Sequence, residues 1–140
     1  MEYRKGSHSV YDLRYHFVWV TKYRYKVLGG EVGKRLRELI RQGCGARGMV
    51  IVRGNIVSDH VRLLLSCPPT LAPSKIMQWL KGRPGRLIRE EFAQLKRRYW
   101  GQHMWAGRYF VGGVGAVTEE MIKEYVENQN DDDNETFKVS

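Results

Sequence analysis

The sequence predicts an α+β domain built around an antiparallel sheet. Three observations predict it. Apolar and polar residues alternate over residues 8–20 and again over 55–67, which is typical of strands with two different faces. Apolar residues recur at helical spacing after the first stretch and after the second. The chain has 140 residues, which is enough for one hydrophobic core.

The first strand is predicted over residues 8–20. Tyr15, Phe17 and Trp19 fall on one side, with Tyr11 and Leu13, while Asp12, Arg14 and His16 fall on the other. Residues 22–26 then alternate lysine or arginine with tyrosine. Two interpretations stay open for them, a solvated strand end or a surface that stacks bases and binds phosphates.

A helix is predicted from Glu31, after the Gly29–Gly30 break, because apolar residues keep one stripe while lysines and arginines face outward. Three glycines, at positions 43, 45 and 48, are expected to end it. Residues 49–54 then form a short strand, and Gly54 and Asn55 are expected to form the turn that follows it.

The strand over residues 55–67 has two unlike faces. Val61, Leu63 and Leu65 form an aliphatic face that belongs to a core. The opposite face carries His60 and Arg62 side by side. Taken alone, such a pair is more often structural than functional: a hydrogen-bonded histidine in the core beside an arginine whose charged end reaches solvent.

A second helical region begins near Pro73–Ser74. Residues 81–86 hold Pro84 and two glycines and are expected to interrupt it, which would open backbone N–H groups to phosphates. The cations of this region form the densest basic surface of the chain. They are Lys75, Lys81, Arg83, Arg86, Arg89, Lys96, Arg97 and Arg98.

A last strand is predicted over residues 108–114, and a last helix is capped by Thr118. Tyr125 and Gln129 are one helical turn apart and share a face of that helix. The order is therefore the ferredoxin-like β-α-β-β-α-β plan plus one terminal helix. The first and third strands are expected at the sheet centre, with two helices on one face and the terminal helix on the other.

Charge predicts the class of partner. The net charge is +9, and residues 1–126 alone carry 23 basic and 10 acidic side chains, or +13. A basic body of this size favours nucleic acid over a membrane surface. Residues 1–130 are expected to form the domain and the acidic residues 131–140 a disordered tail. Without a signal peptide, membrane span or metal-type cysteine spacing, we expect a protein of the cytoplasm with free thiols.

Several segments, in this order, resemble one known family. Asp59-His60-Val61-Arg62-Leu63-Leu64 is similar to a family strand of the form Asp-His-hydrophobic-His-Leu-Leu, and residues 122–129 resemble its nucleophile helix. Residues 15–24 resemble its opening strand, residues 71–83 its second helix, and Trp100-Gly101 with Trp105 the segment before its last strand. The family is that of the single-tyrosine HUH transposases, which move small insertion sequences as single-stranded DNA.

The resemblance implies a specific chemistry. Tyr125 would attack a DNA phosphate and form a 5′-phosphotyrosine, while His60 and Gln129 would hold Mg²⁺ or Mn²⁺. Lys22, Arg24, Lys81, Arg83 and Arg86, with Arg62, are expected to bind the DNA. The implied partners are single-stranded DNA with a hairpin and a second copy of the chain, in a homodimer whose active sites can combine elements of both subunits.

Arg62 departs from the family pattern, which has a second histidine there. A guanidinium has no lone pair to offer, so Arg62 is not a metal ligand and is expected to bind phosphate instead. His16, on the neighbouring strand, is considered as a substitute ligand, although a histidine there is much more often an ordinary core or surface residue. The departure leaves an attenuated enzyme, a decayed copy, or a non-catalytic dimeric binder of single-stranded DNA hairpins. An RNA-recognition module is a third and weaker hypothesis. Residues 108–112 contain two aromatic residues, as such a module would, but they do not match its motif.

Overall fold

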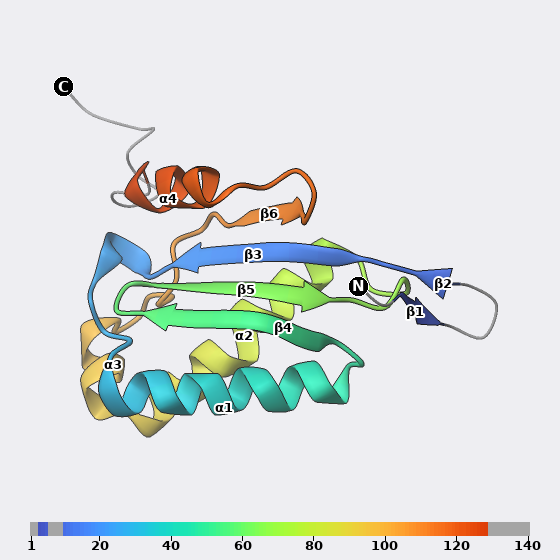
Figure 1. Ribbon diagram of the computed structural model, residues 1–140. Helices are drawn as coiled ribbons and strands as arrows, with labels where there is room; N and C mark the ends of the chain where they lie inside the picture. Colours follow the sequence, from blue (N-terminus) through green and yellow to red (C-terminus); the bar gives the residue numbers. More distant parts are fainter. Residues whose placement is uncertain (1–2, 6–9, 129–140) are drawn as a thin grey trace.

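The computed structural model describes residues 3–5 and 10–128, and the fold and site below concern only these residues (Figure 1). The main sheet has four antiparallel strands in the order β4-β5-β3-β6. They are β3 (Arg14–Val20), β4 (Val50–Val57), β5 (His60–Ser66) and β6 (Phe110–Gly113). The predicted α+β class is confirmed, and so is the central position of the first and third predicted strands, which are β3 and β5.

Helices cover both faces of this sheet (Figure 1). On one face lie α1 (Gly30–Ala46) and α2 (Pro73–Glu91), followed by the short α3 (Ala93–Arg98). On the other face lies α4 (Glu119–Asn128), whose first turn is capped by a hydrogen bond from the Met121 N–H to the Thr118 hydroxyl, at 3.2 Å. Both placements agree with the prediction.

The alternation within β3 divides its side chains between two cores. Phe17 and Trp19 are fully buried in the main core, beneath α1 and α2. Val18 and Val20 are equally buried in a smaller cluster with Ile122 and Val126 of α4. Burying one such side chain stabilises the fold by roughly 1.5–3 kcal/mol, so both helical layers are held through this strand.

The predicted end of the first helix is confirmed at Gly48, which follows the C-cap residue Arg47 with a φ of 71°, but not at Gly43 and Gly45. Helix α1 continues through Gly43 and Gly45 to Ala46, because its buried stripe also continues, from Leu36 to Cys44. Gly43 is a packing residue: a Cβ there would lie 1.6 Å from Cζ2 of Trp79 on α2. The glycine lets two helices approach each other and does not mark a helix end.

The predicted interruption of the second helix is wrong, since α2 runs unbroken through Pro84. A proline inside a helix costs about 3 kcal/mol. Buried Met77, Leu80 and Ile88 lie on both sides of it, and their burial outweighs that cost. The Lys81 carbonyl accepts a hydrogen bond from the indole N–H of Trp105, at 3.0 Å. The helix therefore opens no row of backbone N–H groups to phosphates at this point.

The turn before the His60 strand lies further along the chain than predicted. Gly54 and Asn55 belong to β4, where they face Leu63 and Arg62 of β5. The turn itself is Ser58–Asp59, and β4 pairs with β5 up to Val57 and His60. The second and third strands therefore form one tight hairpin.

The predicted first strand is divided in two. Its later part is β3, while β2 (Val10–Tyr11) pairs with β1 (Arg4–Lys5) in a separate small hairpin. After β3 comes the 3-10 turn η1 (Lys22–Arg24). Among the described residues, no helix combines the length and the apolar character needed to cross a membrane.

Candidate active site

The sheet face beneath α4 brings together the polar residues of the central strands. In the antiparallel register, His60 lies opposite Val20, Arg62 opposite Val18, and Leu64 opposite His16. Directly paired residues point to the same side of a sheet. His60, Arg62 and His16 therefore share the face that α4 covers.

His60 is held by a buried carboxylate. Its Nδ1 lies 2.9 Å from Oδ1 of Asp59, whose residue is only 7% exposed. The other carboxylate oxygen accepts hydrogen bonds from the Arg24 guanidinium, at 3.1 and 3.3 Å. Burial alone would raise the pKa of Asp59, but its hydrogen bond with His60 and the charge of Arg24 hold that pKa below its ordinary value. Asp59 thus fixes the imidazole and leaves Nε2 for a ligand.

The loop that presents Arg24 adopts an unusual backbone conformation. Tyr23 and Arg24 have φ of 61° and 53°, in the left-handed region that non-glycine residues rarely adopt. The ion pair between Arg24 and Asp59 is one of the interactions that hold this turn. Arg24 is therefore positioned by the fold against Asp59, on the buried side of the His60 site.

Arg62 is paired with the first turn of α4. Its Nη2 lies 2.7 and 2.6 Å from the two carboxylate oxygens of Glu119. The hydrogen bond and the charge of Arg62 lower the pKa of Glu119. The pair connects β5 to the helix that carries Tyr125.

Tyr125 lies on α4 above the same sheet face. It packs against the cluster that contains Val18 and Val20, and its ring centroid is 5.8 Å from that of Phe110 on β6. Its hydroxyl oxygen is buried. Val20 lies opposite His60 in the register, so the tyrosine and the histidine border the same small cluster. Gln129, the predicted partner of Tyr125, lies outside the described residues.

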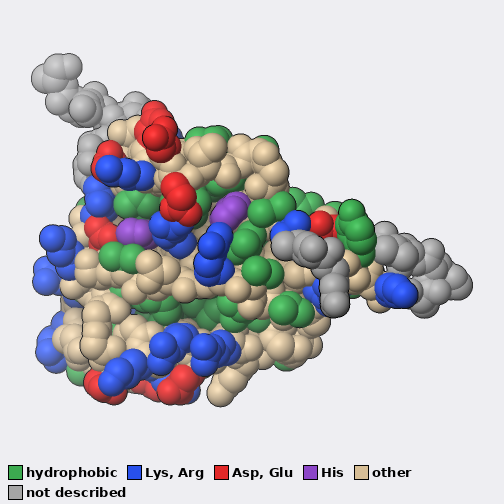
Figure 2. Space-filling model, viewed as in Figure 1, with side chains coloured by type: hydrophobic (Ala, Val, Ile, Leu, Met, Phe, Trp, Pro, Cys, Tyr) green, Lys and Arg blue, Asp and Glu red, His purple; other side chains and the backbone are tan. Residues whose placement is uncertain are grey.

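A cavity of about 350 Å³ opens beside this face. Its charged and titratable lining residues are His16, Arg53, Arg62 and Glu119. Burial lowers the pKa of His16, and the charge of Arg53 lowers it further. Figure 2 shows histidine, basic and acidic side chains gathered on this side of the molecule, below α4. His16 is thus a neutral, half-buried residue of the cavity wall at neutral pH.

The described residues fit a divalent ion only in part. Among them, no group of three or more histidine, cysteine, aspartate or glutamate side chains is placed to hold a metal ion. His60, with Nδ1 fixed by Asp59, has the arrangement typical of a metal-binding histidine. Arg62 does not fit, and it is already paired with Glu119. In the described part of the chain, the imidazole of His60 therefore has an arrangement that fits a metal ligand.

The residues predicted to bind DNA lie in different environments. Arg83 is exposed on α2, and Arg86 on the same helix is exposed and 3.5 Å from Glu90. Lys81 is half-buried, and its Nζ donates a hydrogen bond to the Ala106 carbonyl, at 2.7 Å. Lys22 lies over the ring of Tyr23, at 5.6 Å from its centroid.

The tyrosines of the basic and aromatic segment pack against each other and against α3. The ring centroids of Tyr23 and Tyr25 are 5.4 Å apart, and the Arg98 guanidinium lies 4.4 Å from that of Tyr25. Both rings are half-buried. The structure therefore gives them a packing role, which leaves only part of each ring surface exposed.

Two residues of the site were not assigned a role from the sequence. Asp59 could have been found, because it directly precedes His60 in the strand motif. Glu119 is an acidic residue in the first turn of the last predicted helix, a position that favours negative charge in any helix. No sequence signal connects it to Arg62, since the two are 57 positions apart.

The comparisons with known proteins agree with one another. Residues 9–129 match the family described as "Transposase IS200 like". The chain is 36% identical to the ISDra2 transposase TnpA of Deinococcus radiodurans over 131 residues, which cover 94% of each chain. It is 30% identical to the transposase for insertion sequence element IS200 of Salmonella typhimurium, over 91% of this chain and 83% of that one.

A solved structure gives the same result for the fold. The crystal structure of a Deinococcus radiodurans protein assigned as a transposase matches with a TM-score of 0.84 and 35% sequence identity, over 91% of this chain and 98% of that chain. A family match over nearly the whole chain, two relatives and one solved structure thus lead to the same assignment. The chain belongs to the IS200-like family of transposases, which process DNA.

Proposed function

We propose that this transposase cleaves and rejoins single-stranded DNA of an insertion sequence through a covalent bond to Tyr125. One observation carries the proposal: the helix that bears Tyr125 lies over the sheet face that presents His60 and Arg62. A nucleophile, a fixed imidazole and a guanidinium then border one region. The family assignment gives this arrangement its substrate class.

The covalent step conserves a phosphodiester bond. The Tyr125 oxygen bonds to phosphorus, and the bond from phosphorus to the 3′ oxygen breaks. The products are a 5′-phosphotyrosine and a 3′-hydroxyl, which takes up the proton that the tyrosine loses. Attack by another 3′-hydroxyl on the phosphotyrosine reverses the step and joins two ends.

The nucleophile must be exposed before this step, since its hydroxyl oxygen is buried beside the Phe110 cluster. The segment before α4 offers the freedom for such a movement. It contains Gly115, and glycine has more backbone freedom than other residues. A shift of α4 would also separate Glu119 from Arg62 and free the guanidinium for a phosphate.

A divalent ion is part of the proposal. His60, through Nε2, and Gln129 would hold Mg²⁺ or Mn²⁺, which polarises a phosphoryl oxygen when bound. With one imidazole the site is expected to be weak. Arg62 supplies a fixed positive charge where the family pattern has a second histidine, and it can contact phosphate without a metal.

Hairpin DNA and a second copy of the chain are the proposed partners. The basic surface supports a nucleic-acid partner, with exposed Arg83 and Arg86 on α2 as contacts to phosphates. A location in the cytoplasm stays a prediction.

Mixing Tyr125→Phe protein with His60→Ala protein tests how the dimer builds its active sites. Recovered cleavage means that one active site uses residues of both subunits, while no recovery means that each site is built within one subunit.

A second candidate function is a non-catalytic binder of single-stranded DNA hairpins. The pairing of Arg62 with Glu119 and the single imidazole favour it, because both weaken the metal site of the enzyme. Such a binder would keep the basic surface and the fold. It would form no covalent bond with DNA.

Covalent capture separates the two functions without knowledge of the natural hairpin. The protein is incubated with a random library of single-stranded DNA and Mn²⁺, denatured, and the attached DNA is sequenced while mass spectrometry locates the modified residue. The enzyme gives an adduct on Tyr125 that the Tyr125→Phe variant lacks. If Tyr125→Phe still forms the adduct, the nucleophile is another residue; if no adduct forms while DNA is bound, the binder is the correct function.

A further inference from the structure

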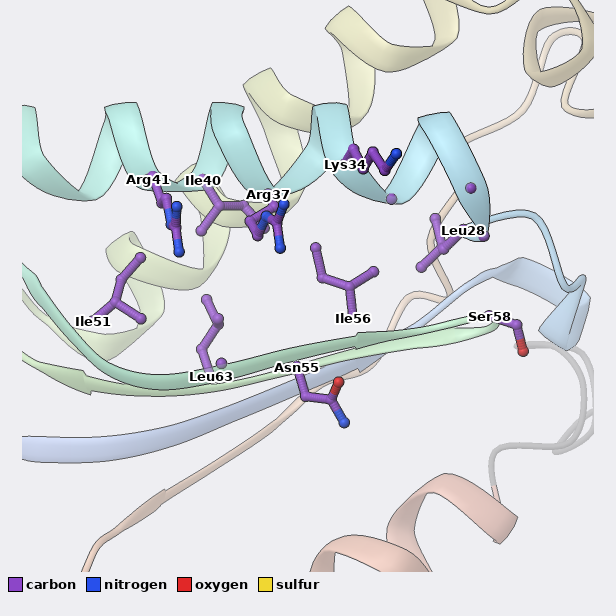
Figure 3. Close-up of a pocket in the computed structure, with 14 residues that line it drawn as sticks. Leu28, Lys34, Arg37, Ile40, Arg41, Ile51, Asn55, Ile56, Ser58 and Leu63 are labelled. Carbon is purple, nitrogen blue, oxygen red and sulfur yellow. The ribbon is translucent and has the colours of Figure 1, made fainter.

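We propose that the groove between α1 and the edge of the sheet binds a single-stranded segment of the DNA substrate, outside the active site. The groove has a volume of about 360 Å³, within the range of ligand pockets. Its walls come from α1 on one side and from β4 and β5 on the other (Figure 3). The inference rests on the proposed function, because it assigns a place to the strand on which that function acts.

The rim of the groove is basic. Lys34, Arg37 and Arg41 line it from successive turns of α1, and no aspartate or glutamate is among its lining residues (Figure 3). These three positions extend about 10 Å along the helix axis, at 1.5 Å per residue. A stacked strand places one phosphate about every 3.4 Å, so the row extends over more than one nucleotide.

Arg37 and Arg41 have their charges available. Both are exposed, and neither forms an ion pair within the part of the chain that the structure describes. Arg35, on another side of the same helix, is in contrast paired with Glu38 and Glu91. The unpaired arginines of α1 are thus the two that line the groove.

The end of the groove at the start of α1 adds a second feature for an anion. Gly29 and Gly30 line it at the start of α1, and no side chain caps the first turn of this 17-residue helix. The free N–H groups and the positive end of the helix dipole favour a phosphate there. Glu31 in the same first turn pairs with Lys34, at 3.3 Å, so most of the positive charge left for a phosphate comes from Arg37 and Arg41.

The floor of the groove is aliphatic. It is formed by Ile40 of α1 together with Ile51, Ile56 and Leu63, which rise from the sheet toward the helix (Figure 3). Such a floor contacts sugars and base faces through dispersion and burial, without hydrogen bonds that read a sequence. Basic walls above an apolar floor match an unpaired strand, whose bases are free to turn inward, better than a duplex.

The groove and the active-site cavity are neighbours across the edge strand β4. Gly54, Asn55 and Leu63 line both this groove and the cavity that contains Arg62 and Glu119. Only β4 separates the two, and Gly54 presents no side chain at the crossing. A single-stranded DNA segment that leaves the active-site cavity can therefore pass over β4 at Gly54 and enter the α1 groove.

Binding measurements with matched variants test this inference. The probe is a thymidine oligonucleotide of about 12 nucleotides, within the site sizes of single-strand binders, and its duplex with an adenosine oligonucleotide is the reference. The Arg37→Glu/Arg41→Glu variant should bind the single strand roughly tenfold more weakly. The slope of the logarithm of its binding constant against the logarithm of salt concentration should also become shallower by about one. Arg108→Glu, at an exposed arginine outside both the groove and the basic surface of α2 and α3, should change the affinity by less than about twofold per charge.

Cross-linking locates the strand directly. Arg41→Cys should form a disulfide with an oligonucleotide whose tethered thiol is protected as a mixed disulfide, by an exchange that releases the protecting thiol, while Arg108→Cys should not. The natural thiols give little background, because burial raises the pKa of Cys44 to about 12 and that of Cys67 to about 11.

The inference fails if the groove variant binds the single strand as well as Arg108→Glu does, or if Arg108→Cys cross-links as well as Arg41→Cys. It fails as well if the groove variant changes the oligomeric state but not DNA affinity, since the groove is then an interface between copies. Covalent capture on Tyr125 is run in parallel. A normal adduct without groove binding overturns this inference alone, whereas groove binding without any adduct overturns only the proposed chemistry.

Discussion

Nη2 of Arg62 lies 2.7 and 2.6 Å from the two carboxylate oxygens of Glu119, and this contact joins strand β5 to the first turn of α4. Arg62 occupies the position where the family pattern has a second histidine. Arg62, which differs from the family pattern, is thus also the residue that connects β5 to the helix that bears Tyr125. The first three predictions follow from this pair.

Arg62→His should raise the rate of DNA cleavage by at least about tenfold, which corresponds to roughly 1.4 kcal/mol of transition-state stabilisation. The substitution adds an imidazole ligand and removes a fixed positive charge beside the ion. Cleavage rates of both proteins are measured across a titration with Mg²⁺ or Mn²⁺. A native protein that already cleaves at a metal-dependent rate, which the substitution leaves unchanged or lowers, would contradict this account of Arg62.

Glu119→Gln should raise the affinity for single-stranded DNA by about two- to fivefold, the range of an exposed ion pair. Glu119 competes with phosphate for the Arg62 guanidinium, and the amide competes less. Glu120→Gln is the matched control, because it removes the same charge from the same helical turn without a contact to Arg62. Equal effects of the two variants would mean that only net charge matters.

The pair should also make stability depend on pH in the acid range. The pKa of Glu119 is lowered from 4.5 in the folded protein, so its stabilising effect is present above that ordinary value and is lost as the pH falls through the folded pKa. Melting temperatures of the native protein and Glu119→Gln should therefore differ at neutral pH and converge in acid. A difference that persists well below about pH 3 would exclude the ion pair as its cause.

Arg83→Glu with Arg86→Glu should weaken binding to hairpin DNA substantially, and the native affinity should fall steeply as salt rises. Both side chains are exposed on α2, so their reversal should leave the fold intact. Fluorescence anisotropy over a range of salt concentrations measures both effects. An affinity that stays flat with ionic strength would show that the basic surface does not bind the DNA.

Gly43→Ala should destabilise the fold by about 1–3 kcal/mol, because the new Cβ would overlap the Trp79 ring. Gly45→Ala in the same helix meets nothing within 4 Å and should instead stabilise it by roughly 0.5–1 kcal/mol. Denaturant unfolding of the two variants gives both signs. If Gly43→Ala raises the free energy of unfolding as Gly45→Ala does, the contact between α1 and α2 does not require a glycine.

The order of the main elements, the two faces of each strand and the cap of the last helix could all be predicted from local patterns in the sequence. The alternation of Phe17 and Trp19 with Val18 and Val20 is a local pattern, and so is the hydrogen bond from the Met121 N–H to the Thr118 hydroxyl. The Asp59-His60 motif and the position of Tyr125 are local as well. Interactions within a strand or a helical turn involve neighbours in the chain, so the sequence displays them directly.

Contacts between distant parts of the chain set where the helices continue and what the polar residues of the site contact. Gly43 lies within a helix because Trp79 packs against it, and Pro84 does so because buried residues on both sides of it hold α2 to the core. Arg62 pairs with Glu119, and Asp59 with Arg24, because the sheet register and the docking of α4 bring them together. The physical reason is common to all of them: packing and charge act over distances in space, and a local pattern of residues does not contain those distances.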